Sequence, residues 1–172
     1  MLDSLYQDLS AAILSIVDDN NNPVFRHIDL WNQQVEYIEK EQPFDTPALF
    51  IEFSTIDWQQ QLQAAQDAPI EITIHIVTRD LANSAHYFAS DGAQQLSHLA
   101  LPNILFAAIH NTHGTNYGPL VRVRSIPNHN HEHFIDQQEV YASALFAQAD
   151  AGDIQKAQLL RYGLHVHIDN TR

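Results

Sequence analysis

The sequence predicts an α+β domain whose antiparallel or mixed sheet of five to six strands carries two main helices. Two of the observations behind this class are a helical period near the N-terminus and a period-two alternation in the middle of the chain. The third is the order of the expected elements, which lacks the strict strand–helix alternation of parallel sheets. With 172 residues, 45% of them hydrophobic, the chain is expected to form one domain over 1–172, with 149–172 as an extension or an extra strand.

The N-terminal helix is expected at 2–17, where apolar residues recur every three or four positions and form one buried stripe. The run 18–22 and the proline that follows it end this helix, since Asn and Asp favour turns and proline has no amide donor. A strand is expected next, at 24–31, and a polar connection at 32–46.

Two further strands are expected in the middle of the chain. Residues 48–53 are bulky and mostly apolar, which is typical of a strand covered on both faces or nearly so. Residues 70–77 alternate isoleucine with mostly polar side chains, which predicts a strand with one buried face. The glutamine-rich segment 59–69 is interpreted as a polar excursion between strands.

The second half of the chain is expected to supply another helix and further strands. After a connection at 80–90, the apolar pattern predicts a helix over 91–109 that Pro102 interrupts or kinks. The remaining strands are expected at 120–126, 140–146 and 162–168, with the polar stretch 127–136 between the first two.

The charge balance bears on the class of partner. Asp and Glu outnumber Lys and Arg by 21 to 8, which gives a formal net charge of −13. Direct binding of nucleic acid is not expected, because it needs a clustered basic face. The N-terminal segment mixes acidic with apolar residues and has no basic leader, so neither a signal peptide nor a membrane span is expected there.

Histidines are the first candidates for a chemical site, because the chain holds eleven of them. The densest group places His129, His131 and His133 at alternate positions, so that an extended backbone would present three imidazoles to zinc. The same segment also suits a solvated polar loop. His110 and His113 lack the spacing of a His-Glu-x-x-His protease and suit the C-terminal end of a helix.

Other catalytic classes find no support in the motifs. The five glycines build no nucleophile elbow around a serine, no phosphate-binding loop and no dinucleotide fingerprint. The chain has no cysteine for a thiol nucleophile or a zinc ligand. We therefore expect no catalytic residue and no cofactor. The alternatives are a small His-rich metal-binding domain with a hydrolytic activity, built on segment 129–133, and an α+β ligand-binding module.

Arginines and tryptophans are candidates for a subunit interface. Arg122 and Arg124 alternate with valines, so both guanidinium groups are expected on one face of a strand, where they either meet solvent or bind an acidic patch of a neighbouring subunit. Trp31 and Trp58 stand at expected strand ends, where an indole ring serves either the core or an interface. Glu36, Glu39 and Glu41 in the polar connection either form a solvated acidic face or supply the complementary patch for these arginines on a neighbouring subunit.

Several stretches together resemble the tail terminator proteins of Mu-like prophages. They are HIDLWNQQ at 27–34, PFDTPALFIEF at 43–53, Trp58 and ITIHIV at 72–77. The order of the expected elements is also similar: a leading helix, a hydrophobic strand after a proline, an isoleucine-rich strand, a second helix and a closing hairpin. The resemblance spans roughly residues 2–147 and leaves 149–172 outside.

This resemblance implies a non-enzymatic role in virion assembly. It implies a hexameric ring that caps the tail tube once the tail has reached its length and offers a surface for joining the head. The implied partners are further copies of the chain, the tail tube protein and head–tail connector proteins. The implied location is the virion tail, after synthesis in the cytoplasm of a bacterial host from a phage or prophage gene.

Overall fold

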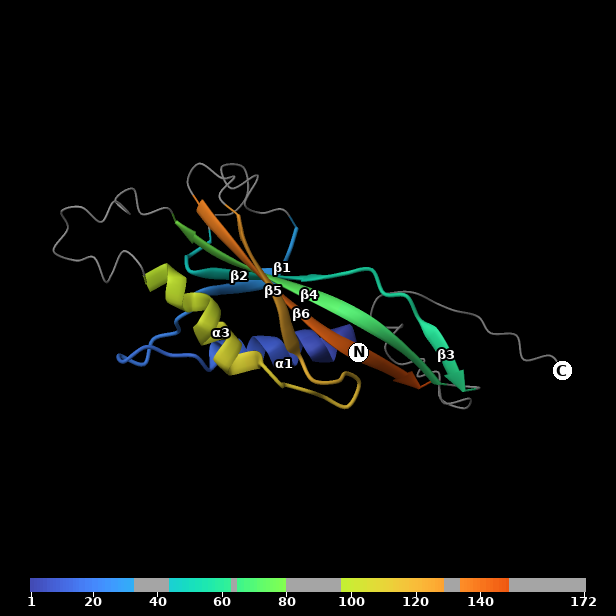
Figure 1. Cartoon of the computed structure of the whole chain (residues 1–172). Coiled ribbons are helices and arrows are strands. Elements are labelled where there is room, and N and C mark those ends of the chain that lie inside the picture. The colour runs from blue at the N-terminus through green and yellow to red at the C-terminus, as the bar shows by residue number, and fades with distance from the viewer. Residues whose placement is uncertain (33–43, 63–64, 80–96, 129–133, 149–172) are drawn as a thin grey trace, which may run out of the picture.

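Both helices lie on one face of a six-stranded mixed sheet (Figure 1). The computed structural model describes residues 1–32, 44–62, 65–79, 97–128 and 134–148. In chain order the elements are α1 (Leu2–Leu14), β1 (His27–Leu30), β2 (Ala48–Phe53), β3 (Gln59–Leu62), β4 (Ala65–Arg79), the 3₁₀ helix η1 (Ser97–Ala100), α3 (Leu101–Ile109), β5 (Val121–Asn128) and β6 (Phe134–Gln148). The predicted α+β class is confirmed.

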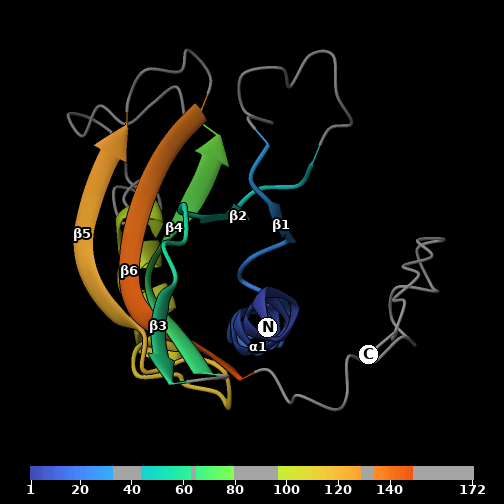
Figure 2. The same cartoon turned by 90° about the vertical axis from the view of Figure 1, so that its right-hand side faces the viewer.

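The sheet has the strand order β1-β2-β4-β6-β5, and β3 pairs with the first residues of β4. β1 runs parallel to β2, whereas the other pairs are antiparallel. β4 and β6 pair along their whole length, from Ala65 opposite Gln148 to Arg79 opposite Phe134, and they curve together through the sheet (Figure 2). The shorter strands are attached to this central pair.

The first helix is shorter than the 2–17 helix that the apolar period predicts. It ends at Leu14, and the chain then turns at Asp18. The Asp18 carboxylate accepts hydrogen bonds from the backbone N–H groups of Asn20 and Asn22, at 2.9 and 2.8 Å. Such carboxylate-to-backbone bonds stabilise a turn in place of another turn of helix.

The interpretation of 59–69 as a polar excursion is wrong, because β3 and the beginning of β4 lie there. The two strands form an antiparallel pair in which Gln59 is opposite Asp67. The side-chain amide of Gln61 donates to the Asp67 carboxylate at 2.6 Å. These strands are largely exposed, so they lack the apolar alternation that marks a strand with one buried face.

The second predicted helix also begins later than its apolar pattern indicates. α3 starts at Leu101 after the short η1, and Pro102 lies in its first turn and does not kink it. Proline is tolerated there, since the first amides of a helix have no helical acceptor. The other predicted strands within the described ranges are present with shifted ends, and β5 and β6 both extend into the expected polar stretch 127–136. The connection 80–90 and the strand expected at 162–168 lie outside the described residues.

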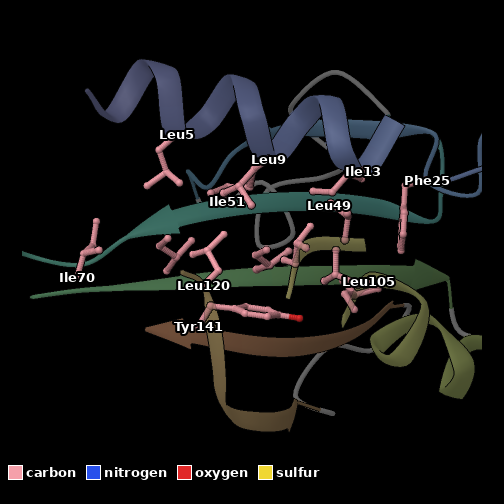
Figure 3. Close-up of a cluster of buried hydrophobic side chains, with 14 of the residues drawn as sticks. Leu5, Leu9, Ile13, Phe25, Leu49, Ile51, Ile70, Leu105, Leu120 and Tyr141 are labelled. Atoms are coloured by element: carbon pink, nitrogen blue, oxygen red, sulfur yellow. The ribbon is translucent and has the colours of Figure 1, made fainter. Parts of the chain in front are cut away.

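The main hydrophobic core lies between the sheet and the helices (Figure 3). α1 packs its buried stripe of Leu5, Leu9 and Ile13 against the sheet, and α3 closes the same face further along. The alternate isoleucines of β4 all face this core, as the period-two pattern predicts; they are Ile70, Ile72, Ile74 and Ile76. The opposite face of β4 is buried as well at His75 and Val77, which the pattern does not predict.

Among the described residues, no helix has the length and apolar character that are needed to cross a membrane.

Candidate functional site

The face of the sheet that points away from α1 and α3 is the candidate interaction surface, and we call it the open face. It carries the residues that alternate with the core isoleucines, such as Glu71, Thr73 and His75 on β4. No helix of the described part of the chain covers it. Along the sheet it divides into an aromatic cluster, an ion pair and a strip of exposed apolar side chains.

The aromatic cluster closes one end of the open face and consists of Trp31, Phe44, Phe50 and Phe134. The ring of Phe50 lies at its centre, with centroid distances of 4.9 Å to Phe44 and 6.0 Å to Trp31, both in edge-on geometry. Such edge-to-face contacts are the favoured arrangement of aromatic pairs. Trp31 follows β1, Phe44 precedes β2 and Phe134 begins β6, so the cluster joins residues from three parts of the chain on this face.

A buried histidine lies directly against the indole of Trp31. The two rings are parallel within 2°, and their centroids are 3.8 Å apart. The Nδ1 atom of His75 lies 3.1 and 3.2 Å from the two carboxylate oxygens of Asp136, and its Nε2 atom lies 3.4 Å from a carboxylate oxygen of Glu52. The side-chain amide of Gln138 donates a further hydrogen bond to Asp136 at 3.0 Å. These contacts join β2, β4 and β6.

The two arginines of β5 lie on opposite faces of the sheet. A β-bulge shifts the register between them, so that Arg122 is opposite Tyr141 and Arg124 is opposite Val140. Neighbouring residues of a strand point to opposite faces, so the prediction that both guanidinium groups leave one face is wrong. Arg124 lies on the open face, where it forms an ion pair with Glu71.

Arg122 points to the helix-covered face and pairs with a buried acid. Its Nη1 atom donates to Glu139 at 3.3 Å and to the carbonyl of Pro102 at 3.4 Å, and its guanidinium lies 4.3 Å above the ring of Phe106. Glu139 is 0% exposed and also accepts a hydrogen bond from the Ser125 hydroxyl at 2.6 Å. A cavity of about 360 Å³ adjoins this pair. Both arginines thus have a partner within the subunit, and their role at a subunit contact stays a prediction.

The apolar strip consists of Val121, Ile126 and Phe146. They are 44%, 42% and 47% exposed, and their register with β6 and β4 places all three on the open face. Val123, in the bulge, is similarly exposed. Along β5, Arg124 lies between Val121 and Ile126, and Phe146 lies further along β6, so the strip is a row of separate exposed apolar side chains.

The other predicted site residues are dispersed or undescribed. Trp58 is 37% exposed just before β3, away from the aromatic cluster that holds Trp31. His110 is the C-cap residue of α3, its predicted place at the end of the helix, and its ring packs on that of Phe106 at a centroid distance of 4.4 Å. The histidines of segment 129–133 and the acidic residues of the polar connection lie outside the described residues; they are His129, His131, His133, Glu36, Glu39 and Glu41. Within the described ranges, no group of three or more metal-ligating side chains is arranged to hold a metal ion.

Two buried tyrosines lie on the helix-covered side. Burial and a 2.9 Å hydrogen bond to the Asp8 carboxylate raise the pKa of Tyr117 to about 12. Burial likewise raises the pKa of Tyr141. Both hydroxyls therefore stay neutral over the physiological range, and neither is suited to act as a base there.

No protein-family model and no curated protein matches the chain. Among solved structures, the fold is similar to a chain in a structure described as "Virion of native gene transfer agent (GTA) particle". The similarity has a TM-score of 0.43 and 11% sequence identity, and it covers 83% of this chain and 92% of that chain. A similarity at this level gives no basis for transferring a function.

Proposed function

We propose that the chain is a non-enzymatic virion assembly protein of a phage, which associates into a ring, caps the tail tube and helps to join the tail to the head. Its proposed partners are further copies of itself, the tail tube protein and head–tail connector proteins. Its proposed location is the virion tail. The resemblance of segments 27–34, 43–53 and 72–77 to tail terminator proteins supplies the kind of assembly.

The observation that supports a contact function is the apolar strip, two residues of which lie on the outer strand β5. Outer strands usually avoid association through charged side chains, proline or bulges. β5 has a bulge and a proline, but it also exposes Val121 and Ile126 at more than two fifths of their surface. In solution such side chains favour association, because burying them against another protein removes apolar surface from water.

Electrostatics also favours a contact at this place on the chain. A net charge of −13 makes copies repel one another unless they meet where the local charge is balanced. Beside the strip, Arg124 and Glu71 neutralise each other, and both are about half exposed. A closed ring needs two different patches on each subunit, and the strip is a candidate for one of them.

The experiment compares strip variants with a matched control. Val121→Lys with Ile126→Lys places two charges in the strip, whereas Leu14→Lys places one charge at the end of α1, at a side chain that is 55% exposed. We expect the strip variant to stay monomeric by native mass spectrometry under conditions in which the wild type forms rings. In a lysogen that carries the variant gene, we expect tails of irregular length that are not joined to heads.

Leu14→Lys should behave as the wild type in both assays. Normal tails from the strip variant, with rings intact, would show that the strip is not the contact surface. A deletion of the gene that leaves tail length and head joining unchanged would contradict the proposed function itself.

A further inference from the structure

A cavity of about 360 Å³ lies on the helix-covered face, between α3 and the strands β4, β5 and β6. We propose that it binds a small carboxylate that has an apolar body, with Arg122 as the residue that recognises the carboxylate group. The apolar strip of the proposed subunit contact lies on the opposite face of the sheet, so this site does not depend on the proposed role in a virion.

Arg122 lines the cavity and is held in place from several sides. Its Nη1 atom donates to the Glu139 carboxylate at 3.3 Å and to the carbonyl of Pro102 at 3.4 Å. Its guanidinium lies 4.3 Å from the centroid of the Phe106 ring, which adds a cation–π contact. A side chain that its own chain has already ordered binds a ligand with a smaller loss of entropy. The arginine is therefore preorganised for a ligand in the cavity.

The guanidinium has donors beyond those that the folded chain uses. An arginine carries five N–H groups, and the contacts with Glu139 and Pro102 take the two on Nη1. Within the described part of the chain, no hydrogen bond uses Nη2 or Nε. The edge formed by these two nitrogens presents parallel N–H groups that match the two oxygens of a carboxylate. The Arg122 side chain is 26% exposed, so it is not sealed off from an entering ligand.

The charges around the cavity favour a monoanion over a cation or a phosphate. Its charged lining residues are Arg122 and Glu139. Glu139 is 0% exposed and also accepts hydrogen bonds from Ser125 and Gln137, so donors of the chain already balance this acid. A ligand ammonium would meet the permanent charge of the arginine without a second acid to offset it. A phosphate dianion would place two negative charges beside a buried carboxylate, whereas a ligand carboxylate adds one.

Apolar side chains supply much of the remaining wall and define the body of the ligand. They are Ile76 from β4, Leu99 from η1, Pro102 from α3, Pro127 from β5 and Ile135 from β6. The cavity volume is near the lower end of the range for small-molecule pockets, which is roughly 300–1,000 Å³. An aliphatic chain on the carboxylate would bury its methylene groups against these side chains, and each buried methylene should tighten binding about fourfold.

Hexanoate is the probe, and its titration into the protein is followed by two-dimensional ¹H–¹⁵N NMR. We expect saturable shifts at residues that line the cavity, such as Asn103 and Gln137. Butanoate is two methylene groups shorter and should bind about sixteenfold more weakly. Hexanamide and hexylamine keep the chain length without the carboxylate, and each should bind at least about tenfold more weakly than hexanoate. Equal binding of hexanamide and hexanoate would show that Arg122 does not recognise a carboxylate.

Two variants test whether the cavity is the place of binding. Arg122→Lys keeps a positive charge beside Glu139 but removes the planar fork, so hexanoate should bind at least about tenfold more weakly. Ile135→Phe adds volume to the cavity wall and should block hexanoate while it leaves the ion pair intact. Ile126→Phe is the matched control, because it makes the same substitution on the open face, and it should bind hexanoate as the wild type does.

Thermal unfolding without ligand checks that each variant retains the fold. If Arg122→Lys does not fold, the comparison of hexanoate with hexanamide on the wild type still tests the guanidinium. The proposal is wrong if the wild type shows no saturable shifts, if the shifts are confined to residues outside the cavity, or if Ile135→Phe binds hexanoate with unchanged affinity.

Discussion

The two faces of the sheet bury an acidic side chain in different surroundings. On the helix-covered face, Glu139 is 0% exposed and is balanced by Arg122, whose charge is permanent. On the open face, Asp136 is 1% exposed and faces His75, whose Nδ1 atom lies 3.1 Å from its carboxylate, and it also accepts a hydrogen bond from the Gln138 side-chain amide. Both acids belong to β6. The difference teaches that equal burial does not imply an equal environment, because one acid is paired with a guanidinium and the other with an imidazole and an amide.

The largest effect is expected from loss of packing on the covered face. Ile74→Ala should lower the free energy of unfolding by about 2–5 kcal/mol, because it removes a fully buried side chain and leaves a cavity. Ile126→Ala on the open face should cost no more than about 0.5 kcal/mol, since this side chain is 42% exposed. Urea denaturation measures both. Equal losses would remove the contrast in packing between the two faces.

The next effect concerns the fixed charge pair. Glu139→Ala should destabilise the fold by about 3 kcal/mol, because Arg122 is then left facing the interior without its counter-ion. The value lies at the low end of the range for buried pairs, since the Arg122 side chain is 26% exposed and reaches some water. Glu139→Gln keeps an acceptor for Ser125 and should cost less. Thermal unfolding of the two variants side by side checks this order.

A smaller effect is expected at alkaline pH on the helix-covered side. The pKa of Tyr117 is raised from 10.0 to about 12 in the folded chain, so the unfolded chain ionises first as the pH rises. Its contribution to stability is therefore complete below about pH 10 and is lost progressively up to about pH 12. Stability is measured as the midpoint of urea denaturation at each pH. In Tyr117→Phe, the midpoint should fall less steeply between about pH 10 and about pH 12 than in the wild type. If the urea midpoint falls equally steeply with pH in the wild type and in the variant, Tyr117 does not contribute to the loss of stability at alkaline pH.

The smallest effect is expected from the exposed ion pair of the open face. A double-mutant cycle on Arg124→Ala and Glu71→Ala should give a coupling of about 0–1 kcal/mol, because both side chains are about half exposed and solvent screens them. High salt should reduce that coupling further. A coupling as large as the loss in Glu139→Ala would mean that the open face is covered in solution.

Much of the fold could be predicted from the sequence where a periodic pattern reports a buried face. The isoleucines of β4 and the leucine stripe of α1 alternate or recur with the period of their element, and both were located correctly. β3 was missed, because its glutamines pair with β4 through the backbone while their side chains are exposed. A strand without a buried face leaves no apolar alternation in the sequence. The turn at 18–22 was located correctly from its Asp and Asn residues, but α1 ends before it, at Leu14.

The candidate site was less accessible to sequence reasoning. His75 was placed correctly in a strand, but its acid partner lies 61 residues further along the chain, and no local pattern joins them. The two arginines of β5 were assigned to one face by alternation, which holds only for a regular strand. The bulge between Arg122 and Arg124 reverses that relation, and neither residue signals it in the sequence.

The uninterrupted ladder between β4 and β6 has a consequence for synthesis of the chain. β4 ends at Arg79 and β6 begins at Phe134, so the middle strand of the sheet lacks its longest partner until β6 has also left the ribosome. Pairing between such distant segments is slow compared with local helix formation, because a large loop has to close first. Nascent chains that stop before β6 should therefore be substrates for chaperones, whereas chains that include it can complete the sheet.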